Sequence, residues 1–171
     1  PAAVEHGGTS YPVTSIGDNA FQYCRQLVSV TFSGSIDCIG DNAFQYCIAL
    51  DTVTFSGDVR SIGFGAFESC GALDTVPFSG DVGSIGDDAF WGCDALENVT
   101  FSGNVDSIEG GSFQYCTALT TIYVPVSTTE DTIDMIRKAL EISGRQDVQI
   151  ERREPEQPSD PATDPSTPSA P

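Results

Sequence analysis

Cysteine is the residue type in this sequence with the most chemistry to offer, and five of its six copies recur at one spacing of 23 residues. A metal site needs two to four ligands close together, usually with a Cys-x-x-Cys pair. No such pair occurs, and the only histidine, His6, lies in a glycine-rich N-terminal stretch. We expect reduced, buried thiols, one per repeat, with no metal or cofactor, and disulfides between neighbouring repeats as the alternative. The five residues are Cys24, Cys47, Cys70, Cys93 and Cys116.

Cys38 lies outside this spacing, at a position that is serine in every other repeat. A position that suits a small polar side chain is expected to lie near the surface, where a thiol is accessible to reagents. We therefore predict that Cys38 is the first cysteine to react.

The charged residues exclude several classes of function. The 171-residue chain has 25 acidic and 7 basic residues, which gives a net charge of −18. Nucleic acids and anionic membranes are bound by basic patches, so we predict no nucleic-acid partner. No apolar run approaches the roughly 18–20 residues that a membrane span needs, so we predict no membrane insertion.

The sequence offers no residue set for catalysis, and we predict that the chain is not an enzyme. His6 has no recurring neighbour that would make it the base of a catalytic triad. The stretch "GFGAFE" (63–68) lacks the third glycine of a dinucleotide-binding loop. The carboxylates are numerous, but none forms a pair that stands out for acid–base chemistry.

One column of acids recurs with the repeat, and calcium binding is the alternative to simple solvation for it. Its members are Asp51, Asp74 and Glu97, with Asp58 and Asp81 nearby. The G-G-x-G-x-D pattern of calcium-binding β-rolls is absent, which favours solvation.

The elements that must position these residues are five repeats, which align without gaps over 13–127. In each repeat a phenylalanine precedes the cysteine by three residues, and a leucine follows it by three. Val or Ile and then a second apolar residue come next, and a Ser-Ile-Gly stretch usually completes the unit. Such a unit is too short to bury a core alone, so neighbouring repeats must stack as a solenoid. The phenylalanines are Phe21, Phe44, Phe67, Phe90 and Phe113.

Spacing also predicts the local structure of each repeat. The alternation of Val53 and Phe55 favours a short strand with two inward side chains. The Gly-Asp pair that follows Ser-Ile leads into one helical turn, which Asp18, Asp41 and Asp87 are placed to cap. We therefore expect strand, turn, short extended stretch and short helix in every repeat.

This pattern, A-F-x-x-C-x-x-L-x-x-V-x-F with Ser-Ile-Gly upstream, resembles the BspA-like leucine-rich repeat. The resemblance covers about two thirds of the chain. It implies an α/β, right-handed leucine-rich-repeat solenoid with a short parallel sheet on its concave face. It also implies a surface or secreted protein of a bacterium or protist, with a role in adhesion to host proteins or other cells.

The two ends of the repeat array differ. Residues 128–153 are predicted to form a C-terminal cap, a helix with the stripe Ile133, Ile136 and Leu140 followed by one last parallel strand. In that strand Val148 is expected to lie in register with Ile122. Ser127 or Thr128 is the expected N-cap, and membrane or partner binding is the alternative role for this amphipathic helix. Residues 1–12 hold only part of a repeat, so the first core layer is expected to be partly bare.

Residues 154–171 contain six prolines and no aromatic residue. This Pro/Ser/Thr/Asp-rich composition is typical of a disordered, partly extended linker or tail. It suits a spacer towards an anchor or a further domain.

The outward strand positions are the best candidates for contact with a partner, because their side chains do not pack in the core. We predict that contact centres on Thr75, Asn98, Thr100, Thr121 and Tyr123, with Tyr123 as the one aromatic anchor. The predicted function is a non-enzymatic, surface-exposed or secreted adhesion module for an extracellular protein or glycan. The alternative is a structural spacer that presents another domain of a longer protein.

Overall fold

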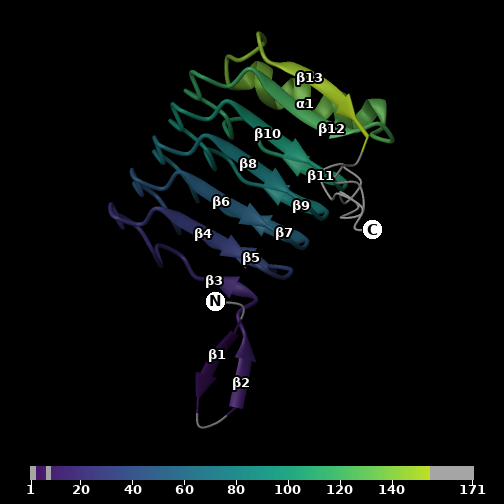
Figure 1. Ribbon diagram of the computed structural model, residues 1–171. Coiled ribbons are helices and arrows are strands. Elements are labelled where there is room, and N and C mark those ends of the chain that lie inside the picture. The colour runs from purple at the N-terminus through teal and green to yellow at the C-terminus, as the bar shows by residue number, and fades with distance from the viewer. Residues whose placement is uncertain (1–2, 7–8, 155–171) are drawn as a thin grey trace, which may run out of the picture.

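The computed structural model describes residues 3–6 and 9–154, and residues 13–127 form a stack of five 23-residue coils (Figure 1). Each coil contributes one strand to each of two parallel sheets and joins them by a turn segment. The coils are residues 13–35, 36–58, 59–81, 82–104 and 105–127. The predicted solenoid, with a C-terminal helix and strand, is confirmed.

The larger sheet has six parallel strands in the order β13-β12-β10-β8-β6-β4. Equivalent residues of neighbouring coils face each other in it: Val30 pairs with Val53, and Val99 pairs with both Val76 and Ile122. These side chains point inward, as the alternation predicts. The strands are β4 (Ser29–Phe32), β6 (Thr52–Phe55), β8 (Thr75–Phe78), β10 (Asn98–Phe101), β12 (Thr121–Pro125) and β13 (Gln149–Arg153).

A second parallel sheet, in the order β11-β9-β7-β5-β3, occupies the stretch that the sequence indicated only as extended. Its inward residues, such as Val59 and Ile62, are three apart, so they do not show the two-residue alternation of a strand. The sheet forms because equivalent strands of neighbouring coils pair in parallel, and the residue pattern within a single coil does not indicate it. The strands are β3 (Ser15–Ile16), β5 (Cys38–Ile39), β7 (Val59–Ile62), β9 (Val82–Ile85) and β11 (Val105–Ile108).

The core consists of columns of identical side chains that run along the stack. Phe44, Phe67 and Phe90 form one column, with ring centroids 5.2 and 5.3 Å apart, and all three are completely buried. A second column, which contains Phe55 and Phe78, lies edge-on to the first. Stacked and edge-to-face rings at these separations add to the free energy gained by burial.

The turn segment of each coil is a series of hydrogen-bonded turns, so the prediction of a short helix there is wrong. Asn19 and Tyr23 have positive φ values of 57° and 60°, and most equivalent positions repeat this conformation. Two left-handed residues within five end any helix. Their amides donate across to the next coil, for example from Tyr23 to the carbonyl of Gln45.

The cysteines of the turn segments are unpaired thiols with a common role. The Sγ atom of Cys70 donates to the carbonyl oxygen of Phe44 in the preceding coil at 3.3 Å, and Cys47, Cys93 and Cys116 make the equivalent bond. These four are completely buried. Cys24 is exposed, contrary to the prediction, because the described residues contain no earlier coil that would cover it.

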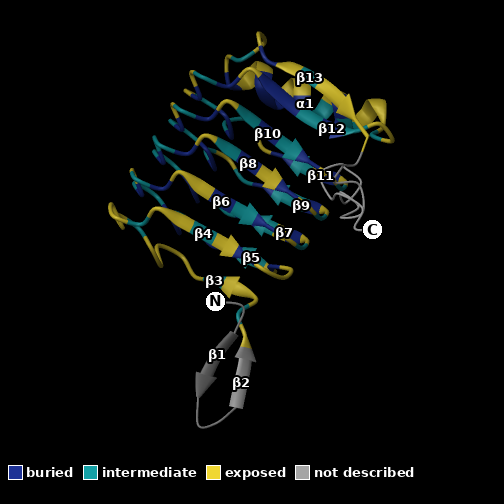
Figure 2. Ribbon diagram, in the orientation of Figure 1, coloured by how far each residue is buried: buried dark blue, intermediate teal, exposed yellow. Residues whose placement is uncertain are grey.

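The C-terminal cap has the predicted order of helix and strand. Helix α1 (Glu130–Ile142) buries the predicted stripe and also Ala139, and Thr129, not Ser127 or Thr128, is its N-cap. Strand β13 then pairs in parallel with β12. In Figure 2 the first coil, with β3 and β4, is mostly exposed, whereas buried segments run through the later coils and along α1. Among the described residues, no helix is long and apolar enough to span a membrane.

One register prediction at the cap is wrong. The residue opposite Ile122 is Ile150 and not Val148. The amide of Val148 donates to the carbonyl of Arg145, which holds Val148 in a turn before the strand begins. Its side chain is nevertheless buried against the core.

The N-terminal end of the stack is open, as expected. The antiparallel hairpin of β1 (Ala3–His6) and β2 (Thr9–Pro12) projects away from the coils (Figure 1). Phe21 is 39% exposed, whereas Phe44 in the next coil is fully buried. An apolar hollow of about 470 Å³ lies at this end, with Leu27 and Val30 in its lining. The predicted disorder of 154–171 falls outside the described residues, except for Glu154.

The thiols should divide into two kinetic classes. Burial raises the pKa of Cys47 to about 11 and that of Cys116 to about 12, and it also raises the pKa of Cys70 and Cys93. Because the thiolate is the reactive form, these four should stay unreactive at pH 8. Cys24 should react first with a chromogenic disulfide reagent and half-buried Cys38 second, which reverses the order expected from the sequence.

Stopped-flow labelling should therefore count two reactive thiols in the folded protein and six in denaturant. Four or more fast thiols in the folded protein would contradict the buried column.

Candidate binding surface

The outer strand face is the solvent side of the six-stranded sheet, made by the first and third residues of each strand. Along β6, β8, β10 and β12 these residues are small hydroxyl, amide and proline side chains, with one tyrosine. They lie on backbone that is hydrogen-bonded on both sides, so the face is rigid. Its members are Thr52, Thr54, Thr75, Pro77, Asn98, Thr100, Thr121 and Tyr123.

The structure brings the five predicted contact residues onto this one face. Asn98 pairs with Thr75 on one side and with Thr121 on the other. Thr100 lies directly beside Tyr123. Thr121 is only 9% exposed, because β13 covers its far side, so it offers a partner little surface.

Tyr123 and Thr100 border a shallow hollow of about 580 Å³ at the carboxyl ends of the strands. The guanidinium carbon of Arg153 lies 3.1 Å from the centroid of the Tyr123 ring, a cation–π contact that fixes both side chains. Pro77 and Ser79 line the opposite wall. The hollow thus combines an aromatic ring, a cation and hydroxyl groups on one rigid surface. Sequence analysis did not find Arg153, because only the structure shows where β13 pairs.

Several aspartate side chains join one coil to the next. Asp41 Oδ1 accepts the backbone N–H of Phe64, 23 residues ahead, and Asp18 does the same for Asp41. They were expected to cap their own turns, but they bind the neighbouring coil. On the opposite turn, Asp58 Oδ1 accepts the N–H of Asp81 at 3.0 Å, and Asp81 Oδ1 accepts that of Asn104.

Calcium binding is the alternative to solvation for the other recurring column of acids. Within the residues that the structure describes, no group of three or more His, Cys, Asp or Glu side chains converges as metal ligands would. Asp51, Asp74 and Glu97 are exposed in a single column.

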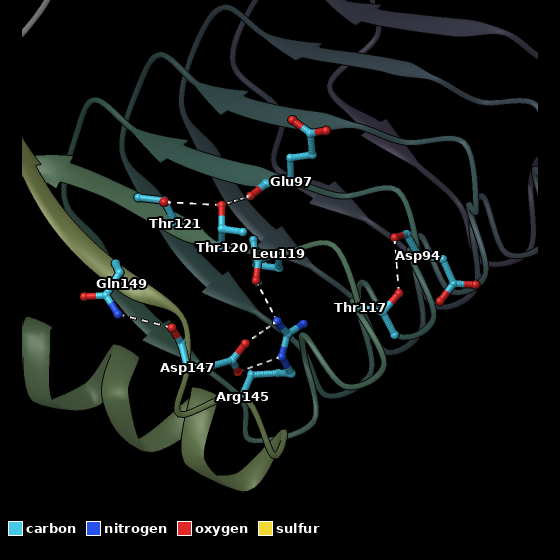
Figure 3. A network of polar contacts seen from close by, with 9 residues as sticks. All are labelled: Asp94, Glu97, Thr117, Leu119, Thr120, Thr121, Arg145, Asp147 and Gln149. Carbon is cyan, nitrogen blue, oxygen red and sulfur yellow. Dashed lines mark hydrogen bonds and ion pairs between the residues drawn. The ribbon is translucent and has the colours of Figure 1, made fainter.

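A polar network joins the cap to the last two coils (Figure 3). Arg145 donates from Nη2 to the carbonyl of Leu119 at 2.6 Å and forms a two-bond ion pair with Asp147. Its side chain is only 13% exposed. Thr120 and Thr117 hydroxyls donate to carbonyls of the fourth coil. No sequence pattern indicates this network, since it lies outside the repeated motif.

Stacked coils with a parallel sheet, a repeat of 23 residues and a recurring Leu define a leucine-rich-repeat solenoid. The chain belongs to the BspA type leucine rich repeat family, whose repeat region matches residues 14–134 in six copies. No curated protein matches the chain.

Two solved structures share this fold. The leucine rich repeat protein of T. pallidum is 29% identical, with a TM-score of 0.61 over 75% of this chain and 58% of that one. A leucine rich cell surface protein of Faecalibacterium prausnitzii is 30% identical, with a TM-score of 0.62 over 75% of this chain and 33% of the other. The chain therefore spans well under two thirds of either protein.

The link between coils can be tested at Asp81. Replacement by alanine removes the acceptor for the N–H of Asn104 and should lower stability by about 1 kcal/mol, or roughly 2–4 °C in melting temperature. Asp81→Asn keeps an acceptor oxygen and should melt within about 1 °C of the parent protein.

Asp106→Ala is the matched control for charge, because Asp106 is exposed and its carboxylate makes no hydrogen bond within the described residues. If Asp81→Ala and Asp106→Ala melt at the same temperature, the acids act only as solvating charges.

Proposed function

We propose that this chain is a non-enzymatic protein-interaction module, exposed on a cell surface or secreted, that takes part in adhesion through its outer strand face. The proposal rests on the alternation within each strand between side chains that pack in the core and side chains that face solvent. In β10, for example, Val99 and Phe101 are buried in the core, whereas Asn98 and Thr100 face solvent. Side chains without a structural role on a rigid sheet are free to serve recognition, and they bind with little loss of conformational entropy.

Family membership supports the interaction role, because leucine-rich-repeat solenoids use their extended sheets to bind other proteins. The cell-surface name of the Faecalibacterium prausnitzii protein supports the proposed location. The proposed partner is an extracellular protein or glycan, of a host matrix or of another cell.

The hollow beside Tyr123 is the proposed centre of contact. A tyrosine ring offers a large amphipathic surface with few rotatable bonds, which is why tyrosine is frequent among the residues that dominate binding energy. Arg153 adds a cation held in place over the ring. The small side chains of Thr75, Asn98 and Thr100 let a partner approach the sheet closely along two coils.

The test is a binding screen against immobilised extracellular-matrix proteins and glycans, with variants of the outer strand face. Tyr123→Ala/Thr100→Lys should weaken binding at least tenfold, because it removes the anchor and places a long cation in the hollow. Its melting temperature should fall by no more than about 2–4 °C, the loss expected from one exposed cation–π contact.

Phe64→Ala/Ser84→Lys is the control, since it removes one exposed aromatic ring and adds one lysine away from the outer strand face. Equal weakening by both double variants would contradict the assignment of the face. Absence of binding across the whole screen would favour the alternative, a spacer that presents another domain.

A further inference from the structure

The turn segments carry exposed aromatic side chains on backbone that is unfavourable for them. Exposed Tyr23 and Tyr115 and half-buried Tyr46 have φ values of 60°, 61° and 59°, whereas the equivalent residue in the fourth coil is Gly92. Bulky residues rarely adopt this left-handed conformation, and glycine adopts it without strain. Folding alone would favour glycine at all three positions.

Tyr115 differs from the other two in its surroundings. It is 56% exposed and lies edge-to-face with Trp91, the only tryptophan, at 5.1 Å between ring centroids. It also borders an open hollow of about 430 Å³ between the fifth coil and the loop that joins α1 to β13. The lining comprises Gln114, Tyr115, Thr117, Ser143, Gly144, Arg145 and Asp147. We call this the cap hollow.

The polar groups of the cap hollow carry charges that cancel. The Asp147 carboxylate accepts two bonds from the Arg145 guanidinium, at 3.1 and 3.0 Å, as Figure 3 shows. Asp147 remains 69% exposed, so its oxygens can accept further hydrogen bonds from solvent or a ligand. A fixed, internally neutralised pair favours a neutral polar ligand over an ion.

Gln114 adds an amide that is free to bind. In the first coils the equivalent amides are used within the protein: Gln22 donates to Gln45, and Gln45 donates to Glu68. Trp91 interrupts this ladder in the fourth coil. Among the described residues the side-chain amide of Gln114 therefore makes no hydrogen bond. Buried Arg145 Nη1 likewise has no partner in the described part of the chain.

We propose that the cap hollow binds a neutral saccharide. The apolar C–H face of a pyranose ring would stack on Tyr115, with Trp91 supporting the tyrosine from its edge. Sugar hydroxyls would donate to Asp147 and pair with the amide of Gln114 and the hydroxyl of Thr117. An anionic ligand would meet the Asp147 carboxylate at the open edge. A proline-rich peptide needs several parallel aromatic ridges, and the lining has only one such ring.

The cap hollow is separate from the outer strand face, so the proposal does not depend on the proposed function. Trp91 provides the signal for its test, because a sugar stacked on Tyr115 changes the environment of the only indole. The full chain is titrated with cellotriose, chitotriose, mannotriose and laminaritriose while tryptophan fluorescence is recorded, and calorimetry confirms any binding. At least one trisaccharide should give a saturable change.

Tyr115→Gly should weaken that binding at least tenfold, and the fold should be preserved, because glycine relaxes the left-handed backbone. Tyr23→Gly is the matched control, with the same backbone conformation and a similarly exposed ring but no hollow, and should bind within twofold of the parent protein. Gln114→Ala should weaken binding several-fold and leaves both aromatic rings in place.

The proposal is overturned if none of the four sugars binds, or if Tyr23→Gly weakens binding as much as Tyr115→Gly. It is also overturned if a decaproline peptide gives the saturable, Tyr115-dependent change and the sugars do not.

Discussion

The structure depends on one constraint: every coil must have the same length, so that each residue lies over its equivalent 23 positions away. The phenylalanine columns, the thiol–carbonyl bonds and the Asp–amide bonds all connect residues at this spacing or three residues from it. The coils are so close that a Cβ atom on Gly80 would lie 2.7 Å from the backbone of Gly57 and Asp58. Gly80 must therefore stay glycine, and an inserted residue would displace every column at once.

The equal length of the coils also determines which residues are covered by neighbouring coils and which stay exposed. An inner coil is covered on both sides, whereas Phe21 of the first coil is exposed and the last coil needs α1 and β13 to cover it. We propose two regions for recognition. One is the outer strand face with its hollow at Tyr123. The other is the cap hollow, where the repeated pattern ends.

Most of the fold follows from the sequence, because repetition shows directly which residues are equivalent. Periodicity predicted the coils, the inward Val53 and Phe55, the C-terminal cap and the bare first coil. Periodicity did not predict the second sheet, because its buried residues Val59 and Ile62 are three apart and not two. The prediction of a short helix in each coil was wrong because a tyrosine in the sequence does not indicate a positive φ value. Of the candidate sites, the outer strand face could be predicted, but the contacts of Arg153 and Arg145 depend on where the cap packs.

Amide hydrogen exchange measured coil by coil tests the central claim, that a coil is stable only when neighbours cover it. Protection should be lowest in the first coil (13–35), rise through the second and reach its maximum in the third and fourth (59–104). The fifth coil (105–127) should stay close to that maximum, because α1 and β13 cover it. Equal protection in all five coils, or weaker protection in the fifth coil than in the first, would contradict the account.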